Sequence, residues 1–221
     1  MTSAITNLNQ YIEHTNLKIT ATEDDIIQLC SEAIQFSFYG VVVNPNKVKQ
    51  TVELLKNDEI KVISVCDFPL GINSTEDKIS EALKIVDDGA DEIDIVANIN
   101  YIKDNDYQYI SSEISLVRRK LPDYIILKVI IEAGLLSDEQ IKNSVKAVID
   151  CKADFVKTST GKSKNASNEQ FKQMVTASNG EIRLKAAGGI RTYSDCQRYI
   201  TAGADRIGTS SSVSIIKEIQ S

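Results

Sequence analysis

The chain has 221 residues, of which 42% are hydrophobic and 25% are charged, a composition typical of folded proteins and too apolar for a disordered one. Its length suits one large domain or two small ones. The formal net charge of −6 argues against a nucleic-acid partner, because binding to phosphate backbones requires clustered lysine and arginine.

Cysteine and histidine are too sparse for a metal site. Cys30, Cys66, Cys151 and Cys196 form no C-x-x-C pair, and His14 is the single histidine. The thiols are expected to be small buried side chains in a reducing compartment. The first fifteen residues lack the basic and apolar regions of a signal peptide, and no run of about 18 apolar residues occurs. We therefore expect a cytoplasmic protein without a membrane partner.

Eight short apolar segments follow one another along the chain, each with the length of a strand. They are residues 11–15, 39–44, 60–65, 91–96, 124–131, 154–158, 181–186 and 205–209. Nearly continuous apolar runs of this length are typical of parallel strands that are covered on both faces.

Amphipathic segments separate these strands. Residues 23–36, 74–89, 168–178 and 193–203 have helical spacing, and the second of them begins with a capping pattern and ends near a glycine. Eight strand–helix pairs imply parallel strands joined by right-handed crossovers. The chain is therefore predicted to be α/β, a single-domain (β/α)8 TIM barrel over residues 1–221 with a short N-terminal extension. An open doubly wound sheet is the alternative, but no G-x-G-x-x-G motif follows any strand.

Charged residues interrupt four of the later strands, where apolar residues are expected. They are Asp94, Lys128, Lys157 and Lys185. Function lies at the carboxyl ends of barrel strands, and side chains that alternate along a strand would bring these four together if they face inward. The alternative is that each lysine reaches solvent between the helices. This alternative is weaker for Lys157 and Lys185, because small turn-forming residues follow both.

Two neighbouring lysines and a carboxylate have a clear chemical use. A free lysine has a pKa of about 10.4, and a second ammonium together with desolvation lowers it. The neutral amine attacks a carbonyl to form a Schiff base. The iminium accepts electrons as a carbon–carbon bond breaks or forms, and a carboxylate moves protons. Lys157, Lys185 and Asp94 supply these parts.

Glycine and serine follow the last two predicted strands. Gly188 and Gly189 come after the seventh, and Gly208, Ser210 and Ser211 lie at the end of the eighth. In barrels of this kind the loops after strands seven and eight often bind phosphate. Ordinary strand-to-helix turns with serine caps are the alternative.

Taken in order, these segments resemble the motifs of the deoxyribose-phosphate aldolase family. The motifs are GADEIDIV, LKVIIE, ADFVKTSTG, KAAGGIRT and GADRIGTSS, preceded by IEHTNLK, VVVNP and DFPLG. The resemblance spans nearly the whole chain.

The resemblance implies a class I lyase that needs no cofactor. Such an enzyme reversibly cleaves 2-deoxy-D-ribose 5-phosphate to D-glyceraldehyde 3-phosphate and acetaldehyde, in deoxyribonucleotide catabolism. Matching the motifs makes Lys157 the Schiff-base lysine, Lys185 the group that lowers its pKa, Asp94 the proton relay and Lys128 a supporting charge. The substrate phosphate would be bound by Gly161, Gly188, Gly189, Gly208, Ser210 and Ser211. Relatives are often dimers, so a homodimer is possible.

Three positions depart from the family pattern: Asp67 replaces a glycine before the phenylalanine of DFPLG, Lys162 an apolar residue, and Ala187 a serine. An ionised Asp67 near the pocket would raise a lysine pKa. Lys162 would either steer phosphate or point to solvent. Two alternatives follow: a lysine aldolase for another phosphorylated sugar, and a non-catalytic protein that binds a sugar phosphate. His14 is interpreted as structural and held by hydrogen bonds.

Overall fold

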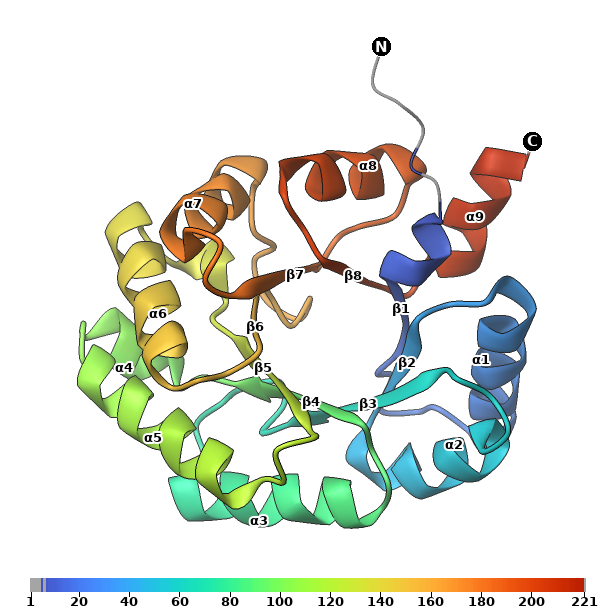
Figure 1. Ribbon diagram of the computed structural model, residues 1–221, viewed down its shortest axis with the longest axis horizontal. Helices are drawn as coiled ribbons and strands as arrows, with labels where there is room; N and C mark the ends of the chain where they lie inside the picture. Colours follow the sequence, from blue (N-terminus) through green and yellow to red (C-terminus); the bar gives the residue numbers. More distant parts are fainter. Residues whose placement is uncertain (1–4, 6, 221) are drawn as a thin grey trace.

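The computed structural model describes residue 5 and residues 7–220. Eight parallel strands form a closed barrel in chain order, with β8 paired to β1, and the helices surround it (Figure 1). The strands are β1 (Ile12–Asn16), β2 (Gly40–Val43), β3 (Lys61–Cys66), β4 (Glu92–Val96), β5 (Ile126–Ile130), β6 (Phe155–Lys157), β7 (Arg183–Ala187) and β8 (Arg206–Thr209). Each overlaps its predicted segment, so the predicted single-domain TIM barrel is confirmed.

Within the described residues there are nine α-helices and three short 3₁₀ helices. The α-helices are α1 (Glu23–Phe36), α2 (Val48–Leu55), α3 (Thr75–Asp87), α4 (Ile99–Lys103), α5 (Tyr107–Lys120), α6 (Asp138–Asp150), α7 (Asn168–Ser178), α8 (Tyr193–Ala202) and α9 (Ser212–Gln220). The 3₁₀ helices are η1 (Leu8–Tyr11), which forms the N-terminal extension, η2 (Pro45–Lys47) and η3 (Ala133–Leu135). The prediction of one helix after each strand is wrong between β4 and β5, where the short α4 precedes α5.

Local sequence signals explain where several helices begin. Thr22, Ser137, Ser167 and Thr192 each form a complete capping box at the start of α1, α6, α7 and α8. Replacing such a cap with alanine costs about 1 kcal/mol. At the start of α3, Ser74 accepts a hydrogen bond from the Asp77 amide, as its spacing predicts. The helices therefore begin where short polar side chains satisfy the first free amides.

Most of the apolar core lies between the barrel and the helices. Outward-facing strand residues such as Val41, Ile93 and Leu127 are buried there against the helices. The only other apolar cluster among the described residues is small and is built on Val42, Ile63 and Val65. Barrels of this kind usually fill their interior with layers of branched aliphatic side chains. Here charged side chains occupy much of that space, which points to the interior as the functional region.

The four cysteines are free and buried, as predicted. Burial raises their thiol pKa values, for example to about 11 at Cys30 and about 12 at Cys196. They are therefore protonated and poorly reactive at neutral pH.

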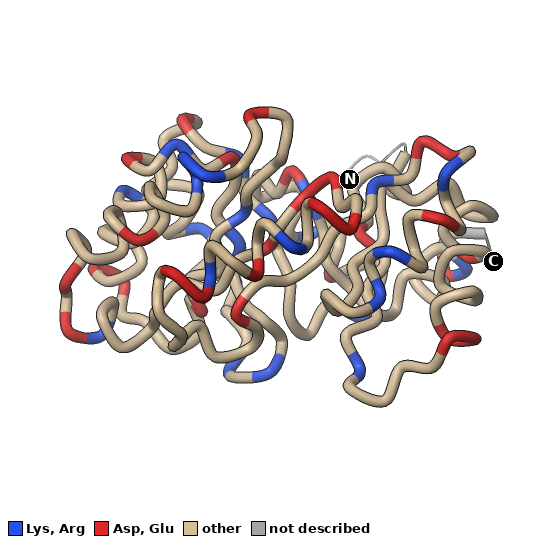
Figure 2. The backbone as a smooth tube through the Cα atoms, turned by 90° about the horizontal axis from the view of Figure 1, so that it is seen from below, with Lys and Arg blue, Asp and Glu red and all other residues tan. Residues whose placement is uncertain are grey.

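Acidic and basic residues are interspersed along the molecule rather than segregated to one side (Figure 2). None of the helices in the described part of the chain is long and apolar enough to cross a membrane.

Candidate active site

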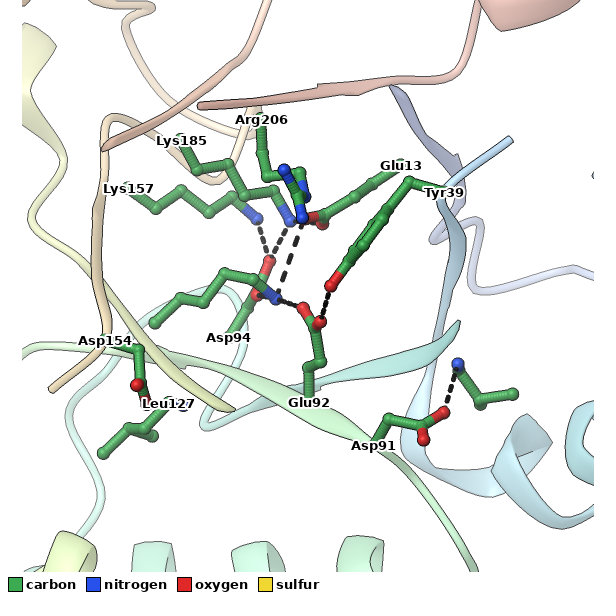
Figure 3. A network of polar contacts seen from close by, with 12 residues as sticks. Glu13, Tyr39, Asp91, Glu92, Asp94, Leu127, Asp154, Lys157, Lys185 and Arg206 are labelled. Atoms are coloured by element: carbon green, nitrogen blue, oxygen red, sulfur yellow. Dashed lines mark hydrogen bonds and ion pairs between the residues drawn. The ribbon is translucent and has the colours of Figure 1, made fainter. Parts of the chain in front are cut away.

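Asp94 is fully buried inside the barrel and contacts three lysine side chains. Its Oδ1 lies 3.0 Å from Nζ of Lys128, and its Oδ2 lies 2.7 Å from Nζ of Lys157 and 2.6 Å from Nζ of Lys185. Figure 3 shows Lys157 and Lys185 pointing toward Asp94 from neighbouring strands. The four charged residues that the sequence places in strands therefore converge, and the outward-facing alternative is wrong for all three lysines.

Strand register explains this convergence. Asp94 is paired with Lys128 across β4 and β5, and Lys157 is paired with Lys185 across β6 and β7. Residues in register on adjacent strands share the same face of a sheet. Barrel closure then brings the two pairs together across the interior.

Two glutamates form a second level of the network. Glu13 in β1 forms a close ion pair with Lys185 and lies 3.8 Å from Nζ of Lys128, and Glu92 in β4 forms a close ion pair with Lys128. The Tyr39 hydroxyl donates to Glu92, and both glutamates are buried (Figure 3). The sequence places Glu92 on the same face as Asp94, but Glu13 was missed. The available signal was the same as for the lysines, a charged residue inside an apolar strand.

Lys157 has the weakest carboxylate support of the three lysines. Among the described residues its Nζ pairs with Asp94 alone, whereas Lys128 and Lys185 each pair with a second carboxylate. The pKa of Lys157 is lowered to about 8, chiefly by burial; Asp94 opposes the shift, and Lys185 adds to it. Desolvation is the larger cause, and the second lysine, which the sequence suggested, is a smaller one.

Lys128 and Asp94, by contrast, keep their charge. Burial opposes ionisation of Lys128, but Asp94, Glu13 and Glu92 raise the pKa of Lys128 above its usual value. Burial would likewise raise the pKa of Asp94, yet the three lysines hold it well below its usual range. Near neutral pH Lys157 thus loses its proton more readily than Lys128.

A cavity of about 540 Å³ lies at the carboxyl ends of the strands, and Lys157 lines it. Lys157 is 4% exposed, whereas Asp94, Lys128 and Lys185 are at 0%. Lys157 is therefore the member of the cluster that a molecule in the cavity can reach. The cavity is also lined by all the residues predicted to bind phosphate: Gly161, Gly188, Gly189, Gly208, Ser210 and Ser211.

The glycines of the cavity wall have backbone conformations that other residues adopt only with strain. Gly161, Gly188 and Gly189 have φ values of 74°, 94° and 73°. A Cβ on Gly188 or Gly189 would lie 2.6 Å from a side-chain atom of Asn165. A Cβ on Gly208 would come within 3.1 Å of Lys185 Cε. The wall is thus built from backbone that approaches its neighbours closely and leaves amides near the cavity.

Several further residues line the cavity without having been predicted from the sequence. Lys18, Asn165 and Arg191 are among them. Lys162, which the sequence left between two roles, is exposed and also lines the cavity. Loop residues of this kind carry no periodic signal, so only their position in the barrel identifies them. Lys18, Lys162 and Arg191 bring positive charge to the lining, which also includes the carboxylates of Asp25 and Glu32.

Asp67 contacts a lysine outside the cluster of Lys128, Lys157 and Lys185, contrary to the expectation from the sequence. Its carboxylate lies 3.5 Å from Nζ of the buried Lys78 and accepts a hydrogen bond from the Asn73 amide. Its φ of 52° is the left-handed conformation that favours glycine. Asp67 therefore shapes the loop between β3 and α3.

His14 has partners for both ring nitrogens. Its Nδ1 lies 3.0 Å from Oγ of Ser212, and its Nε2 lies 2.8 Å from Oε2 of Glu32. Burial lowers the pKa of His14, although Glu32 opposes the shift. These contacts agree with a structural role, at one edge of the cavity. No group of three or more His, Cys, Asp or Glu side chains suited to a metal ion occurs among residues 5 and 7–220.

The chain is similar to known aldolases over nearly its whole length. The family model described as "DeoC/LacD family aldolase" matches residues 4–213. A deoxyribose-phosphate aldolase of Thermococcus gammatolerans is 46% identical over 215 residues, covering 96% of each chain. One from Caldicellulosiruptor saccharolyticus is 47% identical over 212 residues, covering 95% of this chain and 96% of its own.

Solved structures show the same likeness. A putative deoxyribose-phosphate aldolase from Coccidioides immitis superposes with a TM-score of 0.95 at 36% identity, covering 99% of this chain and 88% of its own. A deoxyribose phosphate aldolase from Aeropyrum pernix, described as a unique tetramer, superposes with a TM-score of 0.88 at 31% identity, covering 97% and 91%.

Proposed function

The chain belongs to the DeoC/LacD family of aldolases, and we propose that it reversibly cleaves 2-deoxy-D-ribose 5-phosphate to D-glyceraldehyde 3-phosphate and acetaldehyde through a Schiff base. The observation that carries this proposal is the position of Lys157. It lies at the cavity wall with a pKa lowered to about 8 and contacts Asp94 behind it.

Lys157 is proposed as the nucleophile. Its neutral amine attacks the C1 aldehyde of the open-chain sugar, and loss of water gives an iminium. The C2–C3 bond then breaks. Its electron pair moves toward the iminium nitrogen as the C3 hydroxyl loses a proton, which releases D-glyceraldehyde 3-phosphate and leaves an enamine. Protonation at C2 and hydrolysis release acetaldehyde and regenerate Lys157.

We propose that three neighbouring residues support this reaction: Asp94 transfers protons, Lys185 favours the neutral form of Lys157, and Lys128 positions Asp94. Asp94 lies 2.7 Å from Nζ of Lys157 and relays protons directly or through water. Lys185 lies close enough to the same carboxylate to disfavour a second ammonium. Lys128 holds Asp94 in place through its other oxygen.

The glycine- and serine-rich wall is proposed to bind the substrate phosphate. Gly161, Gly188, Gly189, Gly208, Ser210 and Ser211 line the same cavity as Lys157. Backbone amides and hydroxyls at the ends of β7 and β8 are suited to phosphate oxygens. This arrangement supports a substrate with an aldehyde at one end and a phosphate at the other.

The cellular setting is part of the same proposal. We propose that residues 1–221 act as one domain, in the cytoplasm, in deoxyribonucleotide catabolism, and that the chain forms a homodimer. The Aeropyrum pernix relative is described as a tetramer, so light scattering at several concentrations should distinguish a dimer from a tetramer or a monomer.

Borohydride trapping tests the mechanism. The protein is incubated with acetaldehyde, reduced, digested and mapped by mass spectrometry, with Lys157→Leu as the control variant. An ethyl adduct on Lys157, together with cleavage of 2-deoxyribose 5-phosphate, is the expected result. An adduct without cleavage of that sugar would support an aldolase for another phosphorylated sugar. Absence of the adduct would support the non-catalytic, sugar-phosphate-binding alternative.

A further inference from the structure

Glu132 follows β5 directly and is buried at 3% exposure, yet it does not line the cavity. Its φ of 51° is a left-handed conformation, which is costly for a residue with a side chain and is kept only where the surroundings require it. Residues in such conformations cluster at functional sites. The contacts of its carboxylate indicate what the conformation serves.

The Glu132 carboxylate receives two hydrogen bonds from the loop after β6. The backbone N–H of Thr160 donates to one oxygen and the Ser163 hydroxyl donates to the other. A carboxylate has two acceptor oxygens and no donor, so it satisfies both groups at once. These two donors flank Gly161 and Lys162, which line the cavity. Glu132 therefore holds the loop without itself lining the cavity.

The loop has no regular secondary structure to hold it. Residues 161–165 are all exposed and belong to no helix or strand. Gly134, two residues after Glu132, lies close against the loop, since a Cβ there would lie 2.0 Å from the carbonyl oxygen of Lys164. Fixing an exposed loop in a single conformation costs conformational entropy. The contacts with Glu132 and Gly134 are therefore needed to hold this loop in place.

The anchored loop in turn contacts the wall formed by the end of β7. Asn165 packs so closely on Gly188 and Gly189 that a Cβ on either glycine would come within 2.6 Å of its side chain. Gly161 lies opposite Gly188, with 3.6 Å between the ideal Cβ position of Gly161 and the Cα of Gly188. A continuous series of contacts thus runs from Glu132 through the loop to the glycines of the proposed phosphate site.

We propose that Glu132 is a positioning residue that holds residues 160–165 in the conformation that binds the substrate phosphate, and that it thereby sets the preference for phosphorylated over unphosphorylated sugars. This inference rests on the proposed function. Glu132 touches neither Lys157 nor Asp94 through its side chain, so its loss should weaken phosphate binding and leave Schiff-base formation intact.

Steady-state kinetics with two substrates test the proposal. For Glu132→Ala, KM for 2-deoxyribose 5-phosphate should rise about tenfold or more, the usual effect of losing a charged hydrogen-bond acceptor. The value of kcat/KM for unphosphorylated 2-deoxyribose should change by less than about threefold. Glu132→Gln retains one acceptor and should give an intermediate KM. An equal loss with both substrates, or no change with either, would overturn the proposal.

Two companion variants keep the test decisive. Ser163→Ala removes one contact from an exposed loop, so it cannot unfold the barrel and should raise the same KM by a smaller factor. Glu139→Ala removes an exposed glutamate in α6 and should leave the KM values for both substrates unchanged. If Glu132→Ala does not fold, an unchanged KM in both Ser163→Ala and Glu132→Gln would overturn the proposal.

A ligand-binding measurement separates this inference from the proposed function. Inorganic phosphate should raise the Tm of the wild-type protein, and this shift should be smaller in Glu132→Ala and unchanged in Glu139→Ala. A phosphate shift that depends on Glu132 in a protein that does not cleave 2-deoxyribose 5-phosphate would reject the proposed function alone. A wild-type shift that is identical in Glu132→Ala would reject the role of Glu132.

Discussion

Lys157 and Lys185 are register partners in β6 and β7, and their ammonium nitrogens share a single carboxylate oxygen of Asp94. One carboxylate oxygen therefore faces two lysines, while the second oxygen faces Lys128. Lys185 has a further partner in Glu13, and Lys157 has none among the described residues. This unequal support adds to burial and to the position at the cavity wall as grounds for proposing Lys157 as the nucleophile.

The pH dependence of the reaction should report the amine of Lys157. Its pKa is lowered to about 8, and in the proposed mechanism the neutral form is the nucleophile. Below that pH the amine is protonated, so kcat/KM should fall about tenfold per pH unit; above it, kcat/KM should level off. The profile of kcat/KM against pH for 2-deoxyribose 5-phosphate measures this.

Lys185→Leu should move the acidic limb of the profile, where kcat/KM falls as the pH decreases, to higher pH. The change removes a positive charge that lowers the pKa of Lys157 and leaves the Glu13 carboxylate with one lysine fewer. Both effects favour the protonated form of Lys157. Lys172→Leu, an exposed change in α7, is the control. An unmoved limb in Lys185→Leu would contradict the coupling of the two lysines.

Asp94→Asn should separate Schiff-base formation from turnover. Asp94 raises the pKa of Lys157, so its neutralisation leaves a more readily deprotonated amine. Turnover should nevertheless fall by about 10²–10⁴-fold, because the proton relay is lost. Acetaldehyde trapping on Lys157 at neutral pH should persist. If trapping and turnover disappear together while the Tm is unchanged, Asp94 has a role in forming the Schiff base as well.

Gly189→Ala should raise KM for the phosphorylated substrate. The new Cβ would strain a backbone with φ of 73° and lie 2.6 Å from Nδ2 of Asn165. Gly180→Ala is a matched control, since φ there is 76° and no atom lies within 4 Å of the added Cβ. Both changes should cost about 1 kcal/mol of stability, but only Gly189→Ala should change KM. Equal kinetics in the two variants would argue against a phosphate site at this wall.

Glu13→Ala should destabilise the fold strongly. It leaves Lys185 and Lys128, both at 0% exposure, with one carboxylate fewer. Removing one partner of a buried ion pair costs about 3–5 kcal/mol. Lys56→Ala should cost less than about 1 kcal/mol, because it breaks only an exposed ion pair between Glu53 in α2 and Lys56 directly after it. Urea unfolding of both variants compares the two costs, and similar midpoints would contradict the structural importance of Glu13.

The sequence by itself determined the architecture. Each strand is a local apolar run, and helices such as α1, α6, α7 and α8 combine an amphipathic period with a polar cap, so neither needs long-range information. The extra helix α4 was not predicted, because five residues are too few to show a helical period. Asp94, Lys128, Lys157 and Lys185 were identifiable for a similar reason, since a charged residue within an apolar strand is a local anomaly.

Only the tertiary structure decided which charges meet. Alternation along a strand gives the face of a side chain, but barrel closure selects its partner. Glu13 pairs with Lys185, which is 172 positions away in the sequence. Asp67 pairs with Lys78 and not with Lys157 or Lys185. Glu132 likewise finds its partners in a loop that has no sequence period. Pairings of this kind depend on strand register and loop path, which are properties of the closed barrel and of no single segment.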